Sequence, residues 1–293
     1  MSRMNLTVAL TLMAGVAIME TASAQQSPQS EIPKLAGPDF GWTSVGTDFD
    51  AVPGELPPVG DDPAHPRVGN FQRGPGRPPT FRVANLDNPN LTDFAKEGLK
   101  KTNDEVARGK AVYMREARCW PTGVPTYDIS QGFYYFIQTP KEVLIVWHGN
   151  HEVRHIYLNV PHSQNPKLSW YGESVGHYEG DTLVVDTIGQ NTQTFVDNYR
   201  TPHSEKLHVV ERFHLINDGK NLKADILIED PAAFKQPMHV AHTWRRTPAV
   251  EHGDRGQSPL DEQSCAESGP GNFEFSTNPN IVEPIPTATK ADF

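Results

Sequence analysis

Residues 207–229 read LHVVERFHLINDGKNLKADILIE, and this stretch decides the fold. Apolar and polar side chains alternate on both sides of the turn Asn217-Asp218-Gly219-Lys220. Because successive side chains of a strand point to opposite faces, the alternation predicts two half-buried strands, 207–216 and 222–229. The Asp-Gly pair between them favours a hairpin.

The same pattern of short apolar stretches and tight turns extends over much of the chain. Gly149-Asn150 and Glu179-Gly180-Asp181 supply further turns. We therefore expect a mainly β fold, an antiparallel meander that forms a lipocalin-like barrel or a strongly bent sheet. The lipocalin likeness is an analogy of fold and carries no function. The other expected strands are 133–138, 142–148, 152–158, 170–178, 182–188 and 238–245.

The part of the chain before the strands predicts one helix and an irregular arm. Residues 92–108 read as a helix that Thr92 caps. Residues 25–89 are rich in Pro, Gly, Asp and Asn and show little periodicity, which predicts a long irregular N-terminal arm. We expect the β-rich domain, with its helix, to span residues 90–293.

The first residues are typical of a secretory signal peptide. Arg3 supplies a positive charge, residues 6–19 are apolar, and Ala22-Ser23-Ala24 fits a cleavage site. Cleavage after Ala24 predicts a periplasmic or secreted protein. The later apolar stretches are too short to span a membrane.

Export bears on the two cysteines, Cys119 and Cys265. In an oxidising compartment we expect a disulfide between them. A reactive thiol is the alternative, although neither cysteine lies in a C-x-x-C motif or beside a histidine.

Charge and compartment also limit the partners. The net charge is -10 and no basic stripe is present, so nucleic acid is excluded as an expected partner. Export argues against NAD or ATP, and we expect no cofactor. A small-molecule ligand or substrate is the expected partner.

Glu211 stands out because the alternation places it on the apolar face of its strand, with Val209 and Phe213. A buried carboxylate must be paired or neutralised. One interpretation is a structural ion pair with an inward arginine, and Arg154 is the expected partner. The other is a general acid or base in a cavity, with Arg154 as partner or anion anchor.

Further polar residues lie beside the expected strands. His203 and His162 are loop histidines, and His203 is a candidate proton shuttle, with capping as its alternative. Asp186 shares a face with Val184 and is expected to join the Glu211 network. Asp230 ends a strand before Pro231, where turn capping is expected.

Two motifs carry weaker signals. Gly172-Glu173-Ser174-Val175-Gly176 spells G-x-S-x-G, but the helix that a nucleophile elbow needs is missing from the pattern. His148 and His151 flank a hairpin turn, with His155 farther along. Two facing imidazoles could hold a transition metal, although a third ligand is not evident and solvated side chains are the simpler interpretation.

Residues 170–187, WYGESVGHYEGDTLVVDT, resemble the signature of an exported bacterial family usually labelled hypothetical. The resemblance covers residues 118 to 268 and includes Arg154 with Ile156-Tyr157. The chain departs from the family pattern at His148 and His155, where Glu and Arg are more usual. The resemblance implies the extent of the domain and no activity.

Three functions follow as hypotheses. The first is a cofactor-independent lyase, isomerase or hydrolase acting on a small, partly apolar molecule, with Glu211, Arg154 and His203 as catalytic residues. The second is a binding protein for such a ligand. The third is a structural envelope protein with the Pro-rich arm as its interacting segment. The candidate substrate-binding residues are Tyr157, His162, Ser174 and Asp186.

Overall fold

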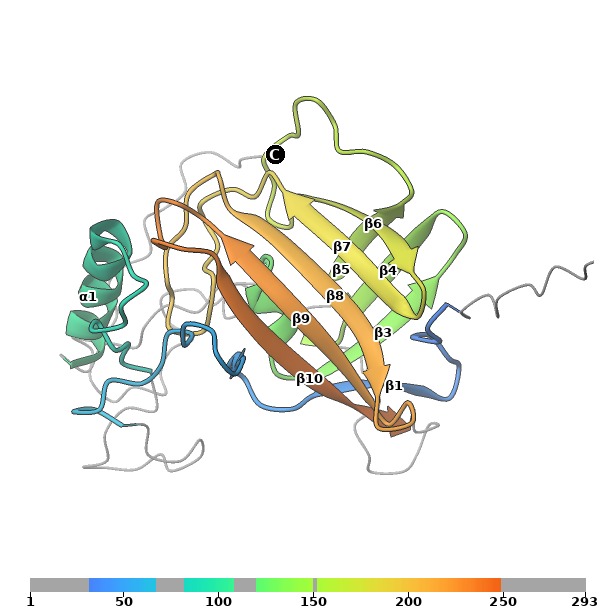
Figure 1. Cartoon of the computed structure of the whole chain (residues 1–293), viewed down its shortest axis with the longest axis horizontal. Coiled ribbons are helices and arrows are strands. Elements are labelled where there is room, and N and C mark those ends of the chain that lie inside the picture. Colours follow the sequence, from blue (N-terminus) through green and yellow to red (C-terminus); the bar gives the residue numbers. More distant parts are fainter. Residues whose placement is uncertain (1–31, 67–81, 108–119, 150–151, 249–293) are drawn as a thin grey trace, which may run out of the picture. The chain divides into compact units, whose positions relative to one another are not determined.

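A computed structural model describes residues 32–66, 82–107, 120–149 and 152–248. The expected signal peptide and both cysteines lie outside these ranges. Within them, nine strands form one closed barrel, which confirms the expected mainly β barrel (Figure 1). The barrel strands are β1 (Phe40–Ser44), β3 (Phe133–Gln138), β4 (Glu142–Trp147), β5 (Val153–Leu158), β6 (Glu173–Glu179), β7 (Thr182–Ile188), β8 (His208–Ile216), β9 (Asn221–Glu229) and β10 (Met238–Pro248). A short strand, β2 (Asp50–Ala51), pairs with β10.

Strands β3 to β10 follow one another around the barrel in chain order, as a meander does. One pair differs from the antiparallel expectation, because β5 and β6 are parallel, with Ile156 opposite Ser174. The long connection 159–172 returns the chain to the end where β5 began. This reversal places the first residues of both strands at the same end of the barrel.

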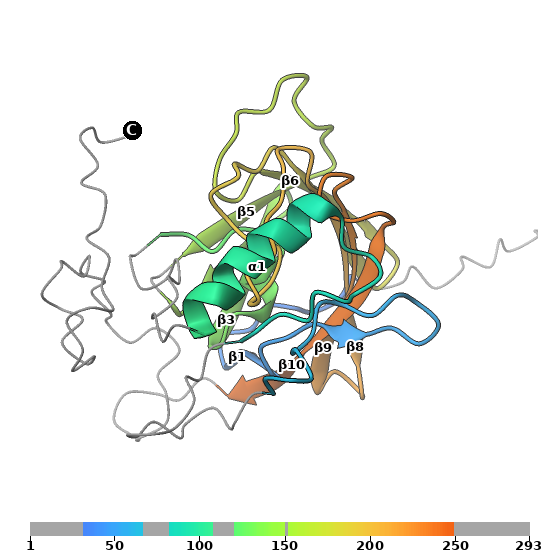
Figure 2. The ribbon, with the colours of Figure 1, turned by 90° about the vertical axis from the view of Figure 1, so that its left-hand side faces the viewer.

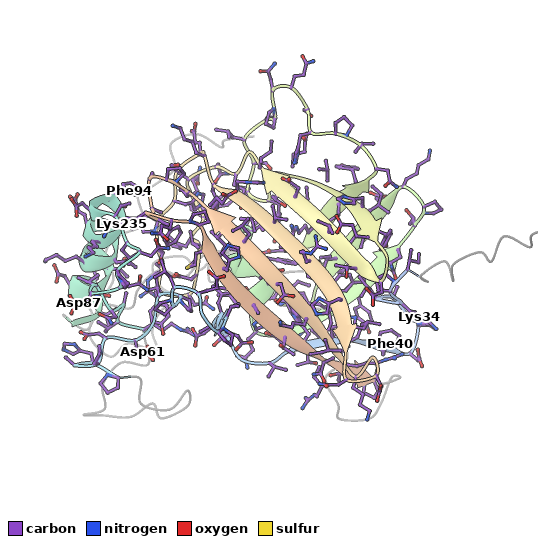
Figure 3. All side chains as sticks on the ribbon, in the orientation of Figure 1. Lys34, Phe40, Asp61, Asp87, Phe94 and Lys235 are labelled. Carbon is purple, nitrogen blue, oxygen red and sulfur yellow. The ribbon has the colours of Figure 1, made fainter. Side chains whose placement is uncertain are left out.

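Strand β1 closes the barrel by pairing with both β3 and β10. This corrects one part of the expected irregular arm, 25–89, because residues 40–44 form a barrel strand. Trp42 and Phe40 are buried, and the Trp42 indole N–H donates to the Leu35 carbonyl oxygen at 2.8 Å. Figure 3 shows Phe40 beside the ends of β1 and β10. Burial of these aromatic side chains holds a five-residue strand that its sequence pattern alone does not reveal.

Helix α1 (Asp93–Ala107) lies beside one end of the barrel, which we call the α1 end (Figures 1 and 2). The expected cap is present, since the Ala95 N–H donates to Thr92 Oγ1 at 3.3 Å. Ala95 and Leu99 are buried in the core, and Gly98 packs closely on Pro202. Lys235, labelled in Figure 3, donates to a carbonyl oxygen just before the helix. None of the helices in the described ranges has the length and apolar character needed to cross a membrane.

The interior of the barrel is filled by side chains. A short 3₁₀ helix, η2 (Thr126–Ile129), is entirely buried at the α1 end. The Tyr127 hydroxyl donates to the Ile145 carbonyl oxygen at 3.0 Å. Helix η2 therefore carries an acidic residue, Asp128, into the core. Aromatic rings of the core pack against one another, with neighbouring centroids 5.4 to 6.3 Å apart: Tyr127, Tyr134, Trp147, Phe213 and Trp244.

Candidate functional site

Arg154 and Glu211 form a fully buried ion pair inside the barrel, as the strand pattern predicts. Arg154 Nη1 donates to Glu211 Oε1 at 2.7 Å, and Nη2 donates to Oε2. The same guanidinium also donates to Ser174 Oγ at 3.3 Å and to Thr187 Oγ1 at 3.0 Å. Arg154 on β5 therefore contacts side chains of β6, β7 and β8. Burial alone would lower the pKa of Arg154, but the charge and hydrogen bonds of Glu211 together with the charge of Asp128 raise it.

Asp128 is the third ionisable side chain of this group. Its Oδ1 lies 3.9 Å from Arg154 Nη1, and the negative charge of Glu211 acts on its carboxyl group. Burial, followed by the negative charge of Glu211, raises the pKa of Asp128 well above its usual value. Among the described residues no donor reaches Asp128 Oδ2, which suits a neutral acid that donates its proton. We interpret the three residues as one cation, one carboxylate and one carboxylic acid.

Aromatic and acidic side chains connect this group with the surface at the α1 end. The half-buried Tyr171 donates its hydroxyl proton to Glu152, which is buried. The Tyr171 ring also contacts the ring of Tyr127, with centroids 5.3 Å apart. Burial, followed by the charge of Glu152, raises the pKa of Tyr171 well above its usual value. Trp120 and Trp170, also half-buried, pack against each other at 5.5 Å beside this position.

His203 is buried at the α1 end but does not join the Arg154–Glu211 group. Its Nδ1 bonds to the Ser204 carbonyl oxygen at 2.9 Å, and its Nε2 bonds to Thr194 Oγ1 at 2.7 Å. Burial lowers the pKa of His203. Both ring nitrogens therefore bond within the β7–β8 connection, and the expected proton-shuttle role of His203 stays a prediction. The expected turn-capping role of Asp230 is confirmed, because its carboxylate accepts hydrogen bonds from Ser204 and Ala232.

Ser174, the central residue of G-x-S-x-G, is buried and bonded to Thr187 Oγ1 at 2.8 Å. The motif lies in β6 and leads into β7, so the helix of a nucleophile elbow is absent. Backbone conformation and packing explain why both positions of the motif are glycine. Gly172 has φ +65°, and a Cβ on Gly176 would lie 2.9 Å from Ile156 Cγ2. Ser174 therefore serves as a hydrogen-bonding partner of Arg154.

Asp186 and His162 lie on the outer surface of the barrel, which corrects the expectation that Asp186 joins the Glu211 network. Asp186 Oδ1 contacts His162 Nε2 at 2.9 Å and His208 Nε2 at 3.1 Å. The side chain of Asp186 is 42% exposed. Tyr157 is exposed on the outer face of β5. Of the expected substrate-binding residues, the structure brings only Ser174 to the interior pair.

The expected weak metal site at the β4–β5 hairpin is only partly described. His151 lies outside the described residues, and His148 is half-buried. His155 is exposed and pairs with Glu142 at 3.2 Å. The described ranges contain no group of three or more His, Cys, Asp or Glu side chains that could hold a metal ion.

Sequence reasoning missed Asp128, because η2 has no alternating pattern that would show which of its side chains enters the core. The alternation in β8 did indicate that the His208 side chain lies on the polar face of the strand, opposite Glu229.

In comparisons with known proteins, no family model and no curated protein matches this sequence, and no solved structure matches the fold.

Proposed function

We propose that the protein is an acid/base enzyme acting on a small, partly apolar molecule, with Asp128 and Glu211 as its proton-transferring groups. The observation that carries the proposal is a set of two buried carboxyl groups beside one buried arginine, with Glu211 paired to Arg154 through both oxygens and Asp128 at 3.9 Å. A carboxylic acid beside a carboxylate supplies a proton donor and a proton acceptor at one place.

The energetics of burial support a functional reason for this group. Removing an arginine and a glutamate from water costs several kcal/mol per ion, and apolar side chains of similar volume are often equally stable in such places. Groups whose pKa is shifted by burial and by a like charge cluster at functional sites. Burial and the negative charge of Glu211 both raise the pKa of Asp128.

The α1 end provides the route to the pair in this proposal. Tyr171 contacts both Glu152 and Tyr127, and Tyr127 precedes Asp128 in η2. A substrate that displaces the half-buried Tyr171 side chain would meet aromatic surface first and the carboxyl pair behind it. Arg154 then holds Glu211 as a carboxylate. Isomerisation, elimination and hydrolysis are the reaction classes that need only these proton transfers.

The compartment belongs to the same proposal. The expected signal peptide, the expected disulfide and the resemblance to an exported family support action in the periplasm or outside the cell. A binding protein is the second candidate function. It is favoured by the packed Trp120–Trp170 pair, an aromatic surface of the kind that holds flat, partly apolar ligands.

Solvent isotope labelling of a small-molecule extract tests the proposal without knowledge of the substrate. The mature protein is incubated with the extract in D2O or in H2¹⁸O, and mass spectrometry detects any metabolite that gains label. Glu211→Gln and Asp128→Asn are expected to reduce labelling by about 100-fold or more, the usual contribution of a general acid or base.

The control is Glu142→Gln, which removes a carboxylate of the outer surface that pairs with His155. This variant should label as the wild type does, and circular dichroism should show that every variant is folded. Labelling that survives both interior substitutions would remove the pair from the mechanism. A metabolite retained by the protein but never labelled would favour the binding protein.

A further inference from the structure

Strands β3, β4 and β5 have an apolar outer surface, which we call the β3–β5 patch. Buried and more exposed side chains alternate along each strand, so the burial pattern identifies the outward positions. Ile137, Val153 and Tyr157 are 47%, 40% and 47% exposed. The patch consists of the outward apolar side chains that are not fully buried: Tyr135, Ile137, Leu144, Val146, Val153 and Tyr157.

The strand register places these side chains in adjacent rows. Tyr135, Val146 and Val153 lie directly opposite one another across the three strands. Ile137 and Leu144 lie opposite each other in the next row. Opposite side chains on neighbouring strands have Cβ atoms about 5 Å apart. The apolar groups therefore form one continuous surface, and continuous apolar surface marks a place where something binds.

This surface differs from the rest of the barrel exterior. A sheet with one solvated face normally carries polar side chains on that face. Strand β8 follows this rule, since its outward side chains include His208, Arg212 and His214. On β3, β4 and β5 the polar outward side chains are Glu142 and His155, which pair with each other at 3.2 Å. The apolar character is therefore specific to one side of the barrel.

An occupant of the β3–β5 patch must bind through side chains. Strand β3 pairs with β1 and β4, and β5 pairs with β4 and β6. The backbone groups of these strands are therefore used within the barrel, and a partner strand cannot extend the sheet as it does in β-augmentation.

The area of the patch suits a short segment better than a second copy of the protein. Strands about 4.8 Å apart, with about five residues of about 3.3 Å each, give a surface of about 250 Å². A stable complex of two proteins buries about 800 Å² on each partner. A second copy would need much more surface than the patch provides.

The described part of the chain ends close to the patch. Strand β10 ends at Pro248, and residues 249–293 lie outside the described ranges. Pro248 lies opposite Phe40 of β1, and β1 pairs in turn with β3 (Figure 1). Two strand spacings amount to about 10 Å, so residues 249–293 start about 10 Å from the first strand of the patch.

The sequence after Pro248 contains apolar residues at alternating positions. Phe273, Phe275, Ile281 and Ile285 all have odd numbers. In an extended chain, side chains at i and i+2 point to the same side, so these four residues would share one face. A random coil of about 25 residues spans about 25–30 Å. About that number of residues separates Pro248 from Phe273, and the segment is therefore long enough to reach the patch.

We propose that the C-terminal segment, residues 269–293, docks on the β3–β5 patch of its own chain, with Phe273 and Phe275 on the apolar side chains. Because the segment belongs to the same chain, the contact is intramolecular, at an effective concentration of about 1 mM. The patch shares no residue with the interior carboxyl groups. This proposal is therefore independent of the proposed enzyme activity.

Photo-cross-linking of the whole chain from Gln25 to Phe293 tests the proposal. Tyr157 is replaced with the photoreactive residue p-benzoylphenylalanine, and mass spectrometry maps the cross-links after irradiation. Position 157 should cross-link to residues 269–293 of the same chain, with a yield that dilution does not change. The matched control carries the photoreactive residue at Arg212, an exposed position on the outer surface of β8, and should give no cross-links to the segment.

Substitutions in the segment test the apolar contact. The double variant Phe273→Ser/Phe275→Ser should lose the cross-links from position 157. Glu274→Ser is its control, because Glu274 lies between the two phenylalanines in sequence and points away from them in an extended chain, and it should keep the full yield. Cross-links between two chains would make a second copy the occupant and overturn the proposal. Absence of cross-links to residues 269–293, or an unchanged yield in the double variant, would also overturn it.

Discussion

At the scale of single residues, Arg154 and Glu211 are the most consequential pair in the core. Both side chains are fully buried, so removing one leaves the other as an uncompensated charge. We expect Arg154→Leu and Glu211→Leu each to lower the free energy of unfolding by about 3–5 kcal/mol. The double variant should lose less than the worse single variant, because leucines of similar volume need no partner.

Urea unfolding followed by tryptophan fluorescence measures all four proteins of this double-mutant cycle. A coupling free energy of several kcal/mol is expected from two residues in direct contact. Purely additive losses would show that the pair is not the interaction that stabilises the core.

The interior pair shows how far residue-scale prediction reaches. The face of Glu211 follows from strict alternation in an uninterrupted strand, and its partner follows because few inward positions carry an arginine. The strand of Asp186 has the run Leu183-Val184-Val185, which is buried throughout, so alternation does not reveal its faces. Asp128 lies outside any strand, where no period exists to read.

At the scale of elements, the seam between β1 and β10 contains a buried histidine with a lowered pKa. His242 is buried, and its Nε2 bonds to Ser44 Oγ at 2.7 Å. Burial lowers the pKa of His242 from 6.5 to about 4. The unfolded chain therefore gains a proton near pH 6.5, whereas the folded chain stays neutral until about pH 4.

Stability from His242 is complete above pH 6.5 and declines as the pH falls towards 4. The decline amounts to about 3 kcal/mol over this window for one group with such a shift. His242→Gln has no proton to gain, so its unfolding free energy should fall less steeply between pH 7 and pH 4.5. Parallel pH profiles from urea unfolding of the two proteins would contradict this assignment.

The parallel pairing of β5 and β6 depends on close approach at Gly176. A Cβ there would lie 2.9 Å from Ile156 Cγ2 and 3.0 Å from the Val184 carbonyl oxygen. Gly176→Ala should destabilise the barrel by about 1–3 kcal/mol through overpacking. Gly60→Ala is the control, since nothing lies within 4 Å of its Cβ position, and its unfolding temperature should be close to that of the wild type. Equal behaviour of the two variants in thermal unfolding would argue against tight packing between β5 and β6.

At the scale of the whole molecule, the hairpins were predictable because each is local, with its turn residues and alternation in one stretch of sequence. Closure was not predictable, because β1 is separated by almost the whole described chain from β10. Its five residues follow Pro33 and Gly37 in a segment whose composition is typical of a loop. Long-range pairing of a short strand depends on the edges it meets, and those edges exist only once β3 to β10 have assembled.

This dependence on β1 predicts the effect of shortening the chain. A protein that begins at Val45 lacks Phe40 and Trp42 and leaves the edges of β3 and β10 unpaired. Loss of one buried tryptophan alone costs about 3–5 kcal/mol, and exposed strand edges promote aggregation. We expect this variant to elute as large aggregates in size-exclusion chromatography, whereas a chain that begins at Ile32 keeps β1 and should elute and unfold as a chain that begins at Gln25 does. A folded chain beginning at Val45 with an unchanged unfolding midpoint would show that β3 to β10 are stable without the strand that joins them.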